Sequence, residues 1–161
     1  MGCDIHCFIE YKHKGSDSWE AHGGKIHLDR DYDLFAVMAD VRNYNKVASV
    51  APRRGLPAGA SWKVREENQL YISETGAGDG ECTAESAARW VAGGLSKYTG
   101  PDNARVTNPD WHSHSWLTPD EFVEALTRVD SADVECRALV ATLREFEKRG
   151  CEARIVFWFD N

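Results

Sequence analysis

The sequence predicts an α+β protein whose mixed or antiparallel sheet contains the first and last strands of the chain, packed by about four helices. Residues 3–10, CDIHCFIE, alternate apolar and polar side chains with the period of a strand. The last residues, RIVFWFDN, form an apolar run of strand length, typical of a strand buried on both faces. Two helical segments precede this run, so helices and sheet segregate along the chain.

The first strand carries Cys3, Ile5, Cys7 and Ile9 on one side and Asp4, His6, Phe8 and Glu10 on the other. Turn residues at 15–17 then favour a hairpin into a short strand near residues 18–22. If the first and last strands pair in antiparallel fashion, Asp4 and His6 lie near Asp160. A parallel pairing would separate them.

Helix starts are indicated by capping residues. Asp31 or Asp33 is the expected N-cap of a helix that ends near Asn43, and Thr83 is the expected N-cap of a helix that runs through Val91. Thr118, followed by Pro119 and Glu121, predicts the start of a third helix. Asp130 or Ser131 is the expected N-cap of a fourth helix, which ends before Gly150. The Pro- and Gly-rich stretches at 51–60, 74–82 and 95–110 predict loops around a strand at 69–73.

Composition restricts the function. A chain of 161 residues predicts a single domain, 1–161. The net charge of −7 argues against bulk nucleic-acid binding, and no apolar run approaches the roughly 20 residues of a membrane span. Five scattered cysteines without an export signal predict free thiols and a cytoplasmic protein.

The segment HSHS at 112–115 is the most conspicuous candidate site. In a regular strand, His112 and His114 would share one face. Together with Asp4 and His6 from the first strand they could hold a divalent metal that generates hydroxide. The alternative is a hydrogen-bonded strand end with no metal or other cofactor.

A metal-free hypothesis assigns His6 and His112 as the acid and the base, with Asp4 orienting one of the two imidazoles. Arg42, Arg53 and Arg54 are the candidate anion-binding residues. Trp62, Trp111, Trp116 and Tyr44 could stack on a base, although most aromatic side chains should be core.

The segments MGCDIH, RDYDLFAVMADVRN, RGLP, HSHSWLT and RIVFWFDN resemble a family of small uncharacterised proteins found in phages and prophages. In that family the central motif reads His-Ser-x-Ser-aromatic-Leu-Thr, so His114 falls on its variable position. The resemblance implies a pocket for a phosphate-bearing small molecule. Its polar positions here are Asp4, His6, Arg42, Asn43, Arg54 and His112, to which Ser113, Ser115 and Trp116 add ligand contacts.

The leading hypothesis is a phage accessory protein of the host cytosol that binds a nucleotide-like ligand and sequesters a host immune signal. Two alternatives stay open: a hydrolase of such a ligand that uses His6 and His112, and an inhibitor that binds a host enzyme through its aromatic surface. A homodimer with the site at its interface is also open.

Overall fold

The computed structural model describes residues 2–131 and 133–161. Within them the strands are β1 (Ile5–Lys12), β2 (Glu20–Ile26), β3 (Gln69–Ser73), β4 (Glu81–Thr83), β5 (Tyr98–Thr99), β6 (Arg105–Thr107), β7 (His112–Leu117) and β8 (Glu152–Phe159). The helices are α1 (Tyr32–Ala39), α2 (Trp62–Glu67), α3 (Ala84–Ala92), α4 (Pro119–Arg128) and α5 (Val134–Lys148), with a 3₁₀ turn at Pro101–Asn103. No helix of these residues is long and apolar enough to cross a membrane.

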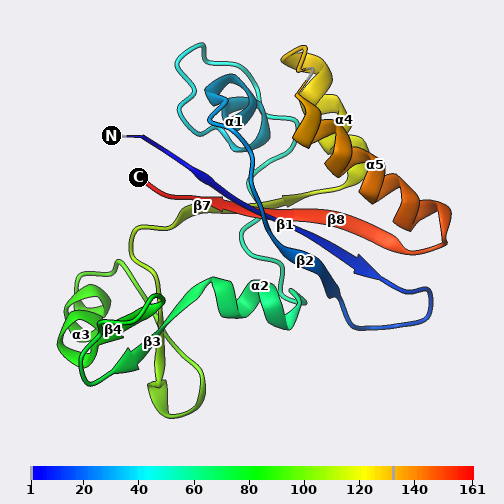
Figure 1. Cartoon of the computed structure of the whole chain (residues 1–161). Coiled ribbons are helices and arrows are strands. Elements are labelled where there is room, and N and C mark those ends of the chain that lie inside the picture. The colour runs from blue at the N-terminus through cyan, green and yellow to red at the C-terminus, as the bar shows by residue number, and fades with distance from the viewer. Residues whose placement is uncertain (1, 132) are drawn as a thin grey trace.

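Sheet A has the strand order β2-β1-β8-β7 and is antiparallel throughout. Its centre is the pair β1–β8, whose register runs from Ile5 opposite Phe159 to Lys12 opposite Glu152. The predicted α+β class, with the first and last strands in one antiparallel sheet, is confirmed. Both ends of the chain lie at the same end of this sheet (Figure 1).

The alternation of β1 decides what each face of sheet A contacts. Ile5, Cys7 and Ile9 are buried against α1, α4 and α5, which cover one face (Figure 1). The opposite face carries a second apolar cluster of Phe8, Val156 and Trp158, which packs against Val64 of α2. Both faces of β8 are therefore buried, as its unbroken apolar run predicts.

Helix caps follow the sequence closely. Thr118 and Glu121 form a capping box at α4, and Thr83 caps α3. Asp31 caps α1, but that helix ends at Ala39 because Asp40 adopts a left-handed conformation. The cap predicted for α5 is wrong, since the residue that accepts from Cys136 N–H is Asp133.

Sheet B was predicted from the sequence only in its strand β3. Its order is β4-β3-β6-β5, and β4, β5 and β6 lie in segments expected to be loops. Strands of two or three residues are too short to show a hydrophobic period. Leu70 and Val106 pack against Ala87 of α3, so one face of sheet B is covered.

The other face of sheet B stays open. Gln69 pairs with Thr107 and Tyr71 with Arg105, while Thr99 lies opposite Arg105 on the other side. Side chains of directly opposed residues share a face. This open face is bordered by α2, a fifth helix that the sequence analysis missed.

Candidate functional site

The two histidines of the HSHS segment lie on opposite faces of sheet A. His112 is paired with Phe159 and Ser115 with Phe157. A step of three residues along β7 therefore matches a step of only two residues along β8. The extra residue forms a β-bulge in which Ser113 has a φ of 56°. The expectation that His112 and His114 share a face is therefore wrong.

His112 faces the helices. Its ring stacks on Phe159 at 6.2 Å between centroids, and its Nδ1 lies 2.9 Å from the Ser113 hydroxyl. Its Nε2 is buried and has no hydrogen-bond partner in the described part of the chain.

His114 faces the other way and stacks on Trp158 at 5.6 Å. The Asn68 side-chain amide donates to His114 Nε2 over 2.7 Å, which requires that nitrogen to be unprotonated. Burial, helped by the nearby His112 and His6, lowers the pKa of His114 to about 4. His114 is thus a neutral structural contact between β7 and the end of α2.

His6 is held by Asp160 rather than by Asp4. His6 Nε2 lies 2.8 Å from an Asp160 oxygen, and the other Asp160 oxygen accepts from the Asp4 N–H. This is the proximity that antiparallel pairing predicts. Because His6 and His112 point to opposite faces, the structure does not bring the predicted acid–base pair together.

Asp4 is engaged by Arg30, whose Nε and Nη2 donate to the two carboxylate oxygens at 2.5 and 2.8 Å. The hydrogen bonds from Arg30 lower the pKa of Asp4. Asp4 therefore does not orient either imidazole.

A polar pocket of about 410 Å³, called the terminal pocket, lies beside Asp4, Arg30 and Asp160. It is lined by Gly2, Asp4, Arg30, Asn108, Asp110, Trp111, Asp160 and Asn161. The His6 ring packs between Trp111, at 5.2 Å, and Trp158, at 5.7 Å, which fixes its orientation at the pocket wall.

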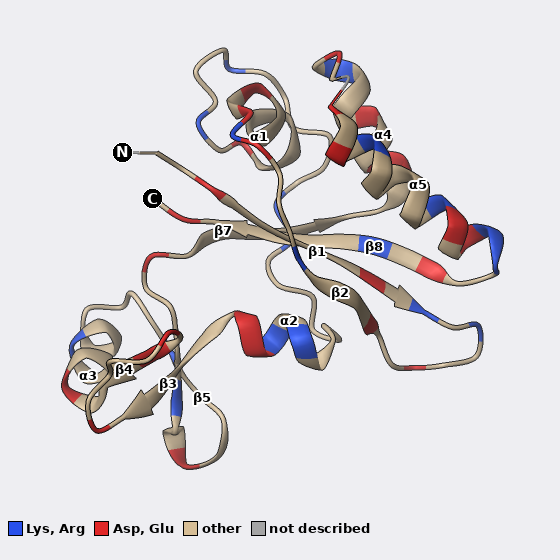
Figure 2. Ribbon diagram, viewed as in Figure 1, with Lys and Arg blue, Asp and Glu red and all other residues tan. Residues whose placement is uncertain are grey.

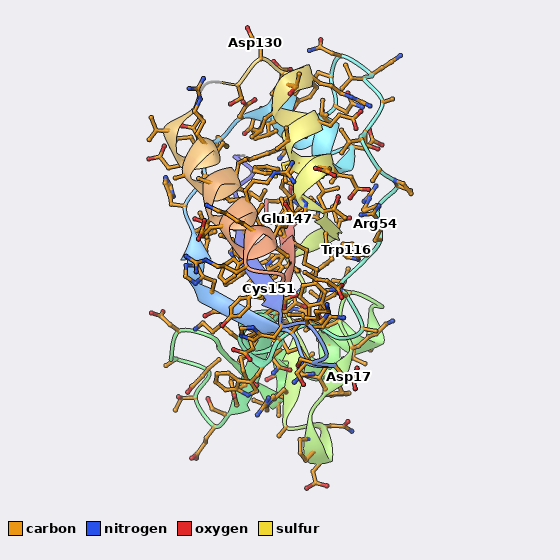
Figure 3. The ribbon with its side chains drawn as sticks, turned by 90° about the vertical axis from the view of Figure 1, so that its right-hand side faces the viewer. Asp17, Arg54, Trp116, Asp130, Glu147 and Cys151 are labelled. Carbon is orange, nitrogen blue, oxygen red and sulfur yellow. The ribbon has the colours of Figure 1, made fainter. Side chains whose placement is uncertain are left out.

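Arg54 joins the loop before α2 to the start of α4. Its guanidinium donates to both Glu121 oxygens and lies 4.4 Å from the centre of the Trp116 ring (Figure 3). The hydrogen bond from Arg54 lowers the pKa of Glu121 to about 2. The buried Ser115 hydroxyl accepts from the Arg54 N–H. Arg54, Ser115 and Trp116 thus hold one another in place.

The remaining predicted ligand contacts are also engaged within the fold. Asn43 orders its own loop through Asp40 and Val47. Ser113 accepts from Arg53 Nη1 at 2.8 Å. Arg42 donates to Asn161 at 3.3 Å, close to the terminal pocket.

The four metal candidates are not gathered into one ligand set. His6 and Asp4 have separate partners, and the bulge separates His112 from His114. Among residues 2–131 and 133–161, no group of three or more His, Cys, Asp or Glu side chains is placed to hold a metal ion.

All five cysteines are free thiols, as predicted. Burial raises the pKa of Cys7 and of Cys136 to about 12. Neither sulfur forms a thiolate near neutral pH, and both side chains pack in the apolar core between sheet A and its helices.

A further pocket lies between α2 and the open face of sheet B. This α2 pocket measures about 420 Å³ and is lined by Leu56, Trp62, Arg65, Glu66, Asn68, Gln69, Thr99, Gly100, Arg105 and Thr107. Ser61 caps the helix, which places Trp62 and Arg65 one turn apart on the same side. The Trp62 side chain is 66% exposed, an unusual exposure for an indole.

Two cations line the α2 pocket. Arg105 donates to Glu66 at 2.5 Å and lies 4.5 Å from the centre of the Tyr71 ring. The exposed Arg65 side chain forms no hydrogen bond or ion pair with the described residues. In Figure 2 the basic part of α2 and its acidic C-terminal end are both visible beside sheet B. The pocket thus combines an aromatic surface, an uncommitted guanidinium and several amide and hydroxyl groups.

Sheet A fixes α2 at both ends. The fully buried Glu10 accepts from the Ser61 N–H at 2.6 Å and from Arg154 at 2.7 Å. At the other end, Asn68 donates to His114. Glu10 and His114 of sheet A therefore position α2 within the fold.

The sequence contained a weak signal for this site. Trp62, Arg65, Glu66 and Gln69 follow the i, i+3, i+4, i+7 spacing of one helix face behind a serine cap. Trp62 was a candidate stacking residue, but Arg65 was missed because a six-residue helix shows less than two turns of pattern.

No protein-family model matches the chain, and no curated protein or solved structure is significantly similar to it. The resemblance to phage and prophage proteins stays a prediction.

Proposed function

We propose that this protein binds a nucleotide-like ligand in the α2 pocket. The observation that carries the proposal is that the exposed Trp62 indole and the Arg65 side chain lie on one helix face and line the same pocket as Arg105. An indole face stacks on any nucleobase, and guanidinium groups bind phosphate oxygens.

The neutral groups of the pocket support the same ligand class. Thr99, Thr107 and Gln69 lie on the open face of sheet B, within the pocket lining. Their hydroxyl and amide groups can bond to sugar hydroxyls and base edges. The pocket volume falls in the range of about 300–1,000 Å³ that small-molecule sites occupy.

Calorimetric titration with a panel of nucleoside monophosphates and dinucleotides tests the proposal. Trp62→Ala should weaken binding about tenfold or more, because stacking contributes about 1–3 kcal/mol per base. Arg65→Ala should weaken binding and make it less dependent on salt.

Matched controls are available on the same part of the molecule. Leu95→Ala truncates another exposed apolar side chain, and Arg89→Ala removes a last-turn arginine from α3. Neither residue lines the α2 pocket. Equal losses in the control and pocket variants, or no binding across the panel, would contradict the proposal.

The phage resemblance extends the proposal to a biological role: an anti-defence protein of the host cytosol that sequesters a nucleotide signal. A sequestering protein returns its ligand unchanged after denaturation. Chromatography of the released ligand measures this directly.

A second candidate, a hydrolase, is favoured by one observation, the pairing of His6 with Asp160. A carboxylate that holds Nε2 leaves Nδ1 as an acid–base group. Product formation that is lost in both His6→Ala and Asp160→Asn would support it, whereas intact ligand after prolonged incubation with the wild type would remove it.

A further inference from the structure

A second pocket continues the α2 pocket along the open face of sheet B. This Trp111 pocket measures about 380 Å³ and is lined by Glu66, Glu67, Gln69, Leu70, Tyr71, Asp79, Gly80, Asn108 and Trp111. The two pockets have Glu66 and Gln69 in common. The two pockets therefore adjoin at these residues, and together they are called the groove below.

Glu66 organises the boundary between the two parts. Its carboxylate accepts hydrogen bonds from Arg105 and Gln69, and from the Tyr71 hydroxyl. Tyr71 in turn lies under the Arg105 guanidinium. This network holds the Arg105 guanidinium, which lines the α2 pocket, against Tyr71, which lines the Trp111 pocket.

Each half has its own aromatic surface. Trp62, 66% exposed, belongs to the α2 pocket, and Tyr71, 42% exposed, belongs to the Trp111 pocket with Trp111 itself. Exposed aromatic faces are stacking surfaces for planar rings. Two separate surfaces suit a ligand with two rings.

The charges of the two halves differ. Arg65 and Arg105 line the α2 pocket, whereas the Trp111 pocket is lined by Glu67 and Asp79 and by no lysine or arginine. A phosphate is favoured beside the arginines and repelled in the second half. Carboxylates accept hydrogen bonds from sugar hydroxyls and base amino groups, so the second half suits an uncharged nucleoside.

We infer that the groove takes a dinucleoside monophosphate, with one nucleoside on Trp62, the phosphodiester at Arg65 and Arg105, and the second nucleoside on Tyr71. This inference rests on the proposed function and names its ligand class.

Titration of the protein with adenosine monophosphate and with adenylyl-adenosine tests the inference. The dinucleoside monophosphate should bind at least about tenfold more tightly, because it adds a second stacked base. Tyr71→Ala should remove this advantage. Trp62→Ala should weaken both ligands.

The matched control is Tyr98→Ala, which removes a similarly exposed tyrosine from the covered side of the same sheet. Asp79→Trp provides a variant that does not depend on the Tyr71 contacts, since this exposed loop residue lines only the second pocket. It should block the second half and reduce adenylyl-adenosine to the affinity of adenosine monophosphate.

The two proposals fail in different ways. Equal affinities for the two ligands, unchanged by Tyr71→Ala and Asp79→Trp, would overturn the two-ring inference and leave nucleotide binding intact. Absence of binding by either ligand would overturn the proposed function itself.

Discussion

Sheet A and sheet B differ in how their polar side chains are used. In sheet A, Glu10 and Arg154 are buried as an ion pair, and Arg154 also lies 3.7 Å from the centre of the Trp19 ring. On the open face of sheet B, Arg105 is partly exposed beside a pocket. The difference teaches that the polar pair at the centre of sheet A is enclosed in the scaffold, whereas the polar residues on the open face of sheet B lie partly exposed at a pocket.

Breaking the ion pair of sheet A should have the largest effect. Glu10→Gln leaves the buried Arg154 without its charge partner, which typically costs about 3–5 kcal/mol. The matched control is Lys12→Ala, which removes an ion pair of the same two strands whose Glu152 partner is 67% exposed and should cost less than about 1 kcal/mol. Urea unfolding measures both. Similar losses of unfolding free energy in the two variants would contradict the prediction that the buried Glu10–Arg154 pair contributes more than the exposed Lys12–Glu152 pair.

Acid should weaken the contact between sheet A and α2. In the unfolded chain His114 becomes protonated below its ordinary pKa of 6.5, whereas in the folded protein it stays neutral to about 4. Protonation therefore favours the unfolded state, and stability falls as the pH drops from 6.5 to 4, by roughly 3 kcal/mol. His114→Gln should lose much less over this interval, as measured by urea midpoints at pH 7 and pH 4.

The Arg54–Glu121 pair should give an intermediate effect. Both side chains are 24% exposed, and Glu121 also completes the capping box of α4. Glu121→Gln should cost about 1–2 kcal/mol. Because the folded-state pKa of Glu121 is lowered to about 2, this contribution is present above pH 4.5 and lost as the pH falls toward 2. Thermal unfolding of wild type and variant at pH 7 and pH 3 checks both points, and a pH-independent difference would contradict them.

The smallest effect on stability is expected at the proposed ligand site. Trp62→Ala and Arg65→Ala change side chains that are exposed, so the free energy of unfolding should move by no more than about 0.5 kcal/mol. The same two variants should lose ligand affinity. A large destabilisation would show that Trp62 belongs to the scaffold.

The two sheets also differ in how well their sequences predict them. Strands β1 and β8 each span eight residues, long enough for alternation or an unbroken apolar run to be recognised. Strands β5 and β6 span two and three residues, and their pairing depends on tertiary contacts rather than on a local pattern. A capping residue was enough to predict a helix only when the helix had two or more turns. The six-residue α2 was missed although Ser61 caps it.

The candidate site shows the same limit. The partnership of His6 with Asp160 follows from antiparallel pairing of the terminal strands and was predictable. The faces on which His112 and His114 lie were not predictable. The left-handed backbone of Ser113 changes the side-chain alternation of β7, and a serine in the sequence does not signal such a conformation. Arg65 became a candidate only when the short α2 was placed beside Arg105.

The attachment of α2 at both ends has a thermodynamic consequence. A helix of six residues would fray in water, yet the contacts from Glu10 to Ser61 and from His114 to Asn68 hold its two ends before any ligand arrives. In the proposed complex, the backbone under Trp62 would therefore lose little conformational entropy on binding, and more of the stacking energy would appear as affinity. Loosening either anchor should raise the dissociation constant by an entropic penalty, without the loss of a single ligand contact.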